Sequence, residues 1–332
     1  MIRRIATAVF VGGLLLATAA VVFLALQPPV LPPSVQAPIE IGSIAVAGDT
    51  TWRWSGSAEC SPGTGASQLE RRSGSGEWLG APLPLVNVFG LSFNDGDHGI
   101  AVGTTARCSR GVAVTEDGGQ TWHYRADNPV LLDAWWSDDR LWGVGLASGS
   151  PQLRAYELAD GFRLVPLARV RPDAPCDFRD GPPSHVAFYD EQVGLLLCQQ
   201  QATDGRLIAR TTTAGAGFER LLDGRPGFGL DGAGPIVDLD VAGNSSAWLQ
   251  FPADADCAAG QLRRSDSQGG VWERLPCAAR RAPYDKILDV AFASKRVGLM
   301  LATKDGALVV VETTDGGSSW KDSGRSDASS AN

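Results

Sequence analysis

Apolar and polar positions follow one another along this chain in a pattern that repeats six times. Each copy is a short apolar segment, a polar turn and a second apolar segment. The copies are SIAVAGDTTWRWSG (43–56), GLSFNDGDHGIAVG (90–103), LDAWWSDDRLWGVG (132–145), HVAFYDEQVGLLLC (185–198), VDLDVAGNSSAWLQF (237–251) and LDVAFASKRVGLML (288–301). Apolar runs of this length, bounded by polar turns, predict hairpins of antiparallel β-strands.

A second motif follows each of these hairpins and ends on an aromatic residue. Its two strong copies are TEDGGQTW (115–122) and TTDGGSSW (313–320). Weaker copies are RRSGSGEW, YELADGF, TTTAGAGF and SDSQGGVW, which end at Trp78, Phe162, Phe218 and Trp272. The six terminal aromatics therefore recur at intervals of 40 to 56 residues.

Together the two motifs describe one unit of four strands with a tight turn before the last strand. Residues 287–320 contain the whole unit: ILDVAF, VGLMLAT, ALVVVETT and the turn that leads into the last strand. Four-stranded units repeated at about 40–50 residues are typical of β-propeller blades. The sequence thus predicts an all-β fold, a six-bladed β-propeller over residues 40–322. Its innermost strands are almost wholly apolar because both of their faces pack on neighbouring blades.

The second motif predicts a turn that stabilises the fold. Asp117 and Asp315 are placed to accept backbone N–H groups across their own turns. The glycines permit positive φ, and the tryptophans cover the hairpin with apolar area. The residues expected to act in this way are Asp117, Gly119, Trp122, Asp315, Gly317, Trp320, Gly269 and Trp272. In two weak copies Thr213 and Ser267 replace the aspartate, which predicts the loss of one turn bond.

The T-x-D-G-G-x-[ST]-W stretch resembles the Asp-box, or BNR repeat, of sialidases, sortilin-type receptors and the photosystem II assembly/stability factor family. The D-x-x-H-G-x-A-V-G segment from Asp95 to Gly103, followed by a box, is most similar to the last of these. The resemblance implies that the box hairpins lie on the outer rim, away from an axial cavity where ligands bind. It also implies a role in binding a protein partner.

A sialidase resemblance would further imply an Arg-Ile-Pro motif and a tyrosine nucleophile paired with a glutamate. The chain has no Arg-Ile-Pro, and its tyrosines are Tyr124, Tyr156, Tyr189 and Tyr284, none with an evident partner. Three histidines and the absence of nucleophile-elbow, zincin, P-loop or EF-hand patterns give no catalytic residue, cofactor or metal site. An enzyme should gather three or more polar groups at the axial pocket, whereas a scaffold should show a broad face without perturbed titratable groups.

The first 26 residues predict a membrane anchor. Residues 5–26 carry no charge, and a helix of 22 residues spans roughly 33 Å, enough for a hydrocarbon core of ~30 Å. Arg3 and Arg4 favour a cytoplasmic N-terminus, with the propeller outside the cytoplasm. A cleaved signal peptide, which would make the protein secreted, is the alternative. Five prolines in 27–39 predict an extended linker, and 323–332 is predicted to be a disordered tail.

Six cysteines follow the anchor: Cys60, Cys108, Cys176, Cys198, Cys257 and Cys277. An even count outside the cytoplasm favours disulfides, and the absence of C-x-x-C disfavours zinc. Short separations suggest Cys176–Cys198 and Cys257–Cys277, and equivalent loops suggest Cys60–Cys108, among fifteen connectivities.

Charge narrows the range of partners. The chain has a net charge of −8, and without Arg3 and Arg4 its 27 basic and 37 acidic residues give −10. An acidic domain has no electrostatic attraction for nucleic acid. We therefore expect a membrane-anchored binding scaffold or assembly factor with a protein partner. The alternative is a sialidase-like glycoside hydrolase or a glycan-binding receptor.

Overall fold

The computed structural model describes residues 41–56, 68–137, 140–147, 150–167, 176, 183–199, 206–222, 236–277 and 284–322. Within these ranges every regular element is a β-strand. The described part contains no helix that is long and apolar enough to cross a membrane. The predicted anchor (1–26), linker (27–39) and tail (323–332) lie outside the described residues.

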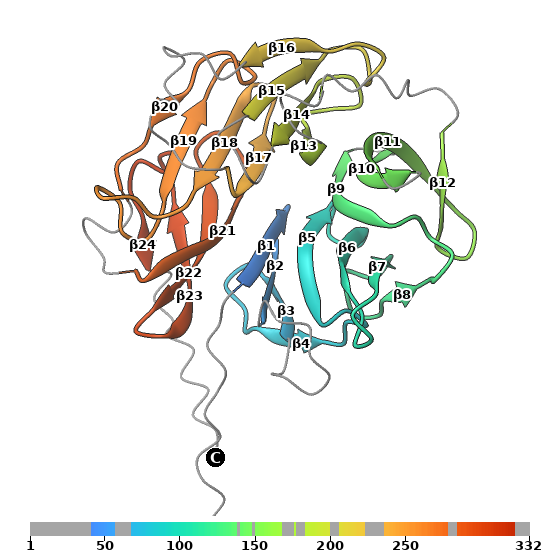
Figure 1. Cartoon of the computed structure of the whole chain (residues 1–332). Helices are drawn as coiled ribbons and strands as arrows, with labels where there is room; N and C mark the ends of the chain where they lie inside the picture. The colour runs from blue at the N-terminus through green and yellow to red at the C-terminus, as the bar shows by residue number, and fades with distance from the viewer. Residues whose placement is uncertain are drawn as a thin grey trace, which may run out of the picture. The chain divides into compact units, whose positions relative to one another are not determined.

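The described strands form six antiparallel sheets of four strands each (Figure 1). We number these sheets as blades 1 to 6 in chain order. The first, innermost strands are β1 (Ile41–Ala47), β5 (Asn87–Phe93), β9 (Leu131–Ser137), β13 (Pro183–Phe188), β17 (Asp238–Ala242) and β21 (Lys286–Phe292). The second strands are β2 (Thr50–Gly56), β6 (Gly99–Thr104), β10 (Arg140–Ala147), β14 (Gly194–Gln199), β18 (Ser246–Phe251) and β22 (Gly298–Lys304).

The outer half of each blade is also built from consecutive strands. The third strands are β3 (Gln68–Ser73), β7 (Arg110–Thr115), β11 (Ser150–Ala159), β15 (Arg206–Thr211), β19 (Gln261–Ser265) and β23 (Ala307–Thr313). The fourth, outermost strands are β4 (Leu79–Ala81), β8 (His123–Tyr124), β12 (Arg163–Pro166), β16 (Glu219–Leu222), β20 (Glu273–Arg274) and β24 (Lys321–Asp322). The all-β, six-bladed architecture predicted from the repeats is confirmed.

The ring closes by packing of blade 6 on blade 1. The innermost strand β1 lies beside both β5 and β21, and each sheet contains only strands that follow one another in the chain. Closure therefore needs no exchanged strand. At the closure Asp289 Oδ2 accepts hydrogen bonds from the Ile44 N–H (2.7 Å) and the Ser43 hydroxyl (3.1 Å).

The hydrophobic core is divided among the interfaces between blades. Six buried clusters are present, one for each neighbouring pair of blades. The innermost and second strands supply most of this area, and every residue of β6 is buried. Because buried apolar area contributes roughly 25 cal/mol per Å², these interfaces provide the main driving force for assembling the ring.

A stacked tryptophan–phenylalanine pair recurs at three of the interfaces. Rings of Trp52 and Phe93, Trp142 and Phe188, and Trp248 and Phe292 lie 3.5, 3.8 and 3.6 Å apart between centroids, within 8° of parallel. The tryptophan always comes from the second strand of an odd-numbered blade. The phenylalanine always ends the innermost strand of the following blade. The propeller is therefore three repeats of a two-blade unit.

Two of these tryptophans also form a hydrogen bond across the interface. Trp52 Nε1 donates to Gly118 O (2.8 Å) and Trp248 Nε1 donates to Gly316 O (3.1 Å). Both acceptors lie in the strong box turns of the following blade. Trp142 Nε1 is buried and has no hydrogen-bond partner among the described residues.

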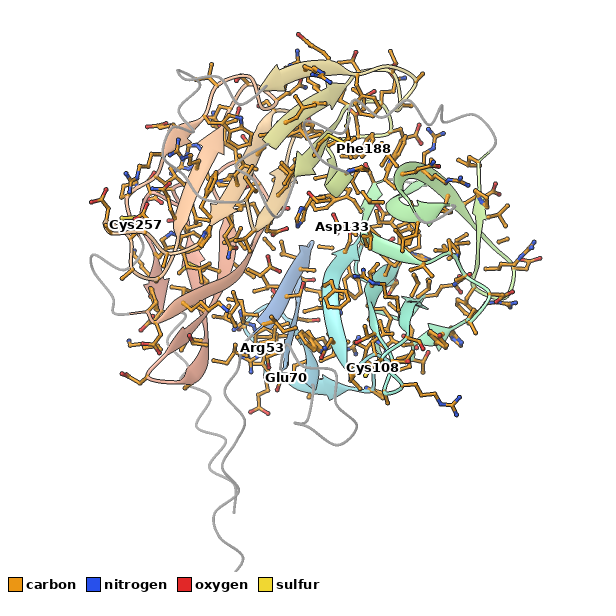
Figure 2. All side chains as sticks on the ribbon, in the orientation of Figure 1. Arg53, Glu70, Cys108, Asp133, Phe188 and Cys257 are labelled. Carbon is orange, nitrogen blue, oxygen red and sulfur yellow. A yellow bond between two sulfur atoms is a disulfide. The ribbon has the colours of Figure 1, made fainter. Side chains whose placement is uncertain are left out.

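Two disulfides are present at the positions that short separation suggested. Cys176 pairs with Cys198, and Cys257 pairs with Cys277. Cys108 is also disulfide-bonded, and its predicted partner Cys60 lies outside the described residues. Figure 2 shows Cys108 and Cys257 toward the periphery of the ring and Asp133 near its centre.

The tryptophan hydrogen bonds yield a stability prediction with a matched control. Trp248→Phe leaves the buried Gly316 carbonyl without its hydrogen-bond donor. Trp142→Phe removes a similar apolar area from an equivalent stack but breaks no hydrogen bond. We expect Trp248→Phe to lower the free energy of unfolding by ~1–3 kcal/mol more than Trp142→Phe, because an orphaned buried polar group costs about that much. Urea unfolding of both variants measures the difference, and equal losses would contradict the role assigned to the bond.

Candidate ligand site in the axial cavity

The box turns are closed by bonds within each turn. Thr121 N–H donates to Asp117 Oδ1 (2.8 Å) and the Thr121 hydroxyl donates to Asp117 Oδ2 (2.6 Å). Ser319 contacts Asp315 in the same way, at 2.8 and 2.6 Å. The glycines at 118, 119, 316 and 317 all have positive φ. Each turn also packs on the first hairpin of its own blade, where Gly118 N–H donates to Asp97 O (2.8 Å).

The weak boxes lose one turn bond, as their sequence predicts, and keep the backbone bond. Gly217 N–H donates to the Thr213 hydroxyl (3.0 Å) and Val271 N–H donates to the Ser267 hydroxyl (2.9 Å). What disappears is the second, hydroxyl-to-carboxylate bond, because glycine and valine stand where the strong boxes have threonine and serine. The acceptor and the donor of this second bond both differ from those of the strong boxes, and the turn keeps the same shape.

The remaining predicted box residues form the same turn geometry. Gly269 N–H donates to the Ser265 hydroxyl (3.0 Å), as Gly119 and Gly317 do to Thr115 and Thr313 (2.9 Å each). Trp122 and Trp320 lie edge-on to Phe93 and Phe292. Trp272 is buried between blades 4 and 5. No box aspartate lines the cavity described next.

A cavity of about 910 Å³ runs along the axis and is lined by all six innermost strands. One position in each of these strands faces it at the same level. Strand register identifies this position, because its partner on the second strand occupies the equivalent place in each blade. The partners are Trp54, Val102, Val144, Leu197, Gln250 and Leu301. We call this set the axial layer, and its members are Ser43, Gly90, Asp133, His185, Asp238 and Asp289.

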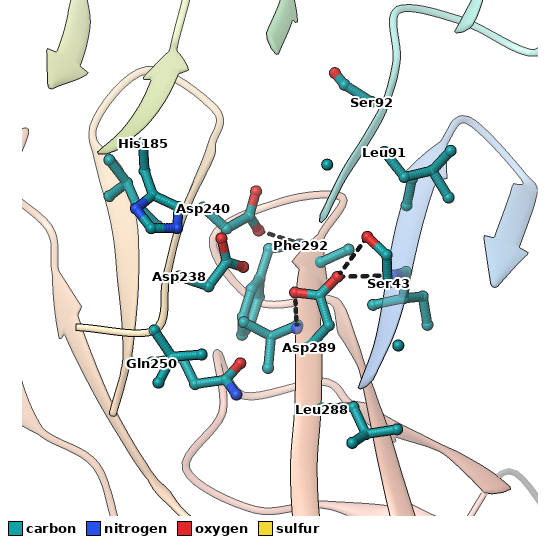
Figure 3. Close-up of a pocket in the computed structure, with 18 of the residues that line it drawn as sticks. Ser43, Leu91, Ser92, His185, Asp238, Asp240, Gln250, Leu288, Asp289 and Phe292 are labelled. Atoms are coloured by element: carbon teal, nitrogen blue, oxygen red, sulfur yellow. Dashed lines mark hydrogen bonds between the residues drawn. The ribbon is translucent and has the colours of Figure 1, made fainter. Parts of the chain in front are cut away.

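The axial layer carries three of the five carboxyl groups on the cavity wall. Asp238 and Asp289 come from neighbouring blades and face each other near His185 and Asp240 (Figure 3). On the other side of the ring Gly90 leaves room for Asp133, because a Cβ at Gly90 would lie 2.9 Å from Asp133 Oδ1. His185, Asp238, Asp240 and Asp289 therefore converge on one part of the axis.

Three carboxylates also connect neighbouring blades. Asp133 Oδ2 accepts the Val186 N–H (2.9 Å), Asp240 Oδ2 accepts the Phe292 N–H (2.7 Å), and Asp289 Oδ2 accepts the Ile44 N–H. Each acceptor belongs to one innermost strand and each donor to the next. Among the described residues Asp238 accepts no such backbone N–H, and its side chain is half-buried.

These carboxyl groups hold protons more tightly than ordinary ones. Desolvation raises the pKa of Asp133 to about 6. Desolvation, reinforced by the charge of Asp238, raises the pKa of Asp240 well above its usual range. The pKa of Asp289 is raised by desolvation, by the charge of Asp238 and by a hydrogen bond with the Asp238 carboxyl. The charges that β17 and β21 bring to the axis thus interact, and protonation of Asp289 relieves their repulsion.

The mouth of the cavity is apolar. Phe89 and Val237 each precede a residue of the axial layer, line the cavity and are 46% and 43% exposed. Asp285 and Lys286 line the cavity where β21 begins. Apolar groups at the entrance and acceptors within are the arrangement expected for an amphiphilic ligand.

Other residues considered from the sequence lie away from this cavity. None of the four tyrosines lines it, and Tyr284 instead donates to Asp322 Oδ1 (2.8 Å) near the outer strand β24. His98 contacts Asp95 within the β5–β6 turn, and His123 stacks on Phe162. His185, in β13, is the histidine that does line the cavity.

No protein-family model matches the chain, and no curated protein matches it in sequence. Solved structures with a similar fold include a GH74 xyloglucanase from Xanthomonas campestris, 13% identical with a TM-score of 0.52 over 85% of this chain and 47% of that one. A GH74 enzyme from Niastella koreensis is 10% identical, with a TM-score of 0.52 over 86% of this chain and 46% of that one. This chain thus spans about half of either enzyme.

The neighbours also include YCF48, a photosystem II assembly factor. YCF48 from Cyanidioschyzon merolae is 21% identical, with a TM-score of 0.43 over 73% of this chain and 86% of that one. YCF48 bound to a D1 peptide is 15% identical, with a TM-score of 0.42 over 73% of this chain and 83% of that one. The family that the motifs resemble is thus among the structural neighbours.

The raised pKa of Asp133 predicts a pH dependence of stability. Its pKa is about 6 in the folded protein against an ordinary 3.8, so between these values the folded state binds more protons than the unfolded state. The contribution of Asp133 to the free energy of unfolding therefore falls as pH rises from about 4 to about 7. We expect Asp133→Asn, which keeps an acceptor for Val186, to flatten this decline in urea unfolding across that range.

Asp133→Ala provides the matching control. It also removes the titration, but it leaves the Val186 N–H without an acceptor, so it should lower stability at every pH. A decline in Asp133→Asn as steep as that of the unmodified protein would contradict the assignment.

Proposed function

We propose that the protein is a binding propeller that acts as an extracytoplasmic scaffold or assembly factor and holds a protein partner at the mouth of its axial cavity. The observation that supports this most directly is the cavity itself, about 910 Å³, with converging acceptors inside and exposed Phe89 and Val237 at the entrance. Cavities of several hundred Å³ with an apolar lining and a few placed polar groups are typical of ligand sites.

The cavity differs from the broad, unperturbed face expected of a passive scaffold. Polar groups with raised pKa values gather at the axis, which was the feature expected of an enzyme. A glycosidase, however, separates its two carboxyl groups by roughly 5–9.5 Å, so that water or the sugar fits between them. In this cavity Asp133, Asp240 and Asp289 instead each accept a backbone N–H of the next blade, and this structural use of the carboxyl groups favours recognition over hydrolysis.

We propose that residues 5–26 tether the protein to a membrane. Their 22 uncharged residues are long enough to span a membrane, and Arg3 and Arg4 would keep the N-terminus in the cytoplasm. A protein partner at the membrane surface then meets the propeller outside the cytoplasm, where the two disulfides are stable.

The mouth of the cavity gives a matched pair of variants for testing partner binding. Val237 at the mouth is 43% exposed, and Val297, in the turn that follows β21, is 48% exposed at the opposite end of the innermost strands. We expect Val237→Ser to reduce recovery of the partner severalfold, whereas Val297→Ser leaves it unchanged. The measurement is crosslinking of the full chain in membranes, detergent purification and quantitative mass spectrometry.

Two results would contradict this function. Recovery of no stoichiometric partner, or equal recovery by the two valine variants, would remove the case for binding at the mouth. Release of sugar from oligosaccharides by the purified chain, lost in Asp238→Asn, would establish the glycoside hydrolase alternative. Resistance of the full chain to alkaline carbonate extraction, lost on deletion of residues 1–26, tests the tether separately.

A further inference from the structure

The axial cavity offers hydrogen-bond acceptors in excess of donors on blades 5 and 6. Asp238 and Asp240 come from β17, Asp289 from β21, and Gln250 from β18, where it pairs directly with Asp238 across the ladder. Three of the donors near this corner are already paired, since Ser43 and Ile44 donate to Asp289, and Phe292 donates to Asp240. Lys286 also lines the cavity, three residues before Asp289 at the start of β21. The side chains of this corner therefore present oxygen atoms to the cavity.

Gln250 supplies an observation that is independent of the carboxylates. Its side chain is 2% exposed and its Oε1 has no hydrogen-bond partner among the described residues. Its Nε2 donates to Ile287 O (3.1 Å), and this carbonyl fixes the orientation of the amide because it accepts only a donor. Oε1 consequently points toward the carboxyl pair, as Figure 3 shows. A buried acceptor without a donor is costly, so a donor is expected to occupy the site.

We propose that this corner of the cavity, formed by Asp238, Asp289 and Gln250 Oε1, binds an organic cation, the ammonium or guanidinium group of a basic side chain. The inference rests on the proposed function and names the chemical group that the partner inserts. Such a group is rich in N–H donors and has no acceptor, which complements the oxygen atoms of this corner. The methylene stem of the same side chain would lie against the apolar mouth at Phe89 and Val237.

An organic cation fits this corner better than a metal ion does. Within the described ranges no three histidine, cysteine or acidic side chains are grouped so as to hold a metal ion. The cavity is also far larger than a metal ion requires. A guanidinium group, by contrast, offers five N–H donors in a planar fork and can engage two carboxylates and an amide oxygen together.

Binding should be linked to proton release. The titratable groups that line the cavity are Asp133, His185, Asp238, Asp240, Asp285, Lys286 and Asp289, and β1 and β5 contribute none. The pKa of Asp289 is raised by burial and by the charge of Asp238, and an entering cation favours its ionised form, so the proton of Asp289 is released to solvent. Affinity should therefore rise with pH, and the heat of binding should depend on the ionisation heat of the buffer.

The test is calorimetric titration of the full chain in detergent with three probes. A pentapeptide Ala-Ala-Arg-Ala-Ala supplies the cation on a polypeptide, its citrulline counterpart removes the charge at nearly constant shape, and agmatine supplies the cation without a peptide. We expect the arginine peptide to bind at least tenfold more tightly than the citrulline peptide, and Asp238→Asn to weaken it at least tenfold. Asp305→Asn, which removes a charge in the β22–β23 turn outside the cavity, should leave affinity unchanged.

Each outcome decides the inference. Equal binding of the arginine and citrulline peptides, or no binding by either, overturns it, and this comparison uses the unmodified chain and so does not depend on folding of a variant. Agmatine binding as tightly as the peptide assigns the site to a small amine, whereas tighter peptide binding assigns it to a polypeptide. A partner recovered equally well by Asp238→Asn would leave the proposed function standing and refute the cation site.

Discussion

The stack of a tryptophan on a phenylalanine ring across alternate blade interfaces is the interaction on which the ring depends. It joins the second strand of an odd-numbered blade to the innermost strand of the next, and it recurs at Trp52, Trp142 and Trp248. The geometry of the stack also explains why glycine begins the second strand of blades 2, 4 and 6. A Cβ at Gly99, Gly194 or Gly298 would overlap the phenylalanine ring of the same blade, so the first position of these second strands must lack a side chain.

The stack makes the box turns part of the interface as well as of their own blades. The carbonyls that accept from Trp52 and Trp248 belong to Gly118 and Gly316, whose positive φ turns them toward the preceding blade. Arg71 reaches the same turn from blade 1, with Nη1 3.4 Å from Gly118 O. The aspartate of the box therefore shapes a turn whose outward carbonyl is used by a neighbour, which is why a hairpin on the rim influences packing nearer the axis.

The repeat and its hairpins could be predicted from the sequence because they depend on local bonds. Thr115, Asp117, Gly119 and Thr121 satisfy one another within seven residues, so their spacing alone identifies the turn. The two-blade period was also written in the sequence, as tryptophans in copies one, three and five and Phe with Gly in copies two, four and six. A comparison of the copies as six equal units does not detect this period, because it covers two blades.

The axial layer could not be predicted in the same way, because it is defined by register and by contacts between blades. β-Bulges shift the innermost strands between Val88 and Gly90 and between Ile287 and Asp289, and such shifts change which side chain faces the axis. A signal did exist: Asp133, Asp240 and Asp289 are charged residues inside strands that are otherwise apolar on both faces. A carboxylate in such a place must have a partner, and here the partners are N–H groups of the next blade.

The carboxylates around the axis differ in whether they hold neighbouring blades together or are available to a ligand. Asp133, Asp240 and Asp289 each accept a backbone donor, so part of their charge is used in holding neighbouring blades together. Asp238 brings a further charge beside Asp289 and accepts no backbone N–H of the next blade among the described residues, and this charge raises the pKa of Asp289. Stability of the ring alone would favour an apolar residue at this position. A fourth carboxylate in the corner that also holds the unpaired Gln250 oxygen is therefore better explained by a ligand than by the fold.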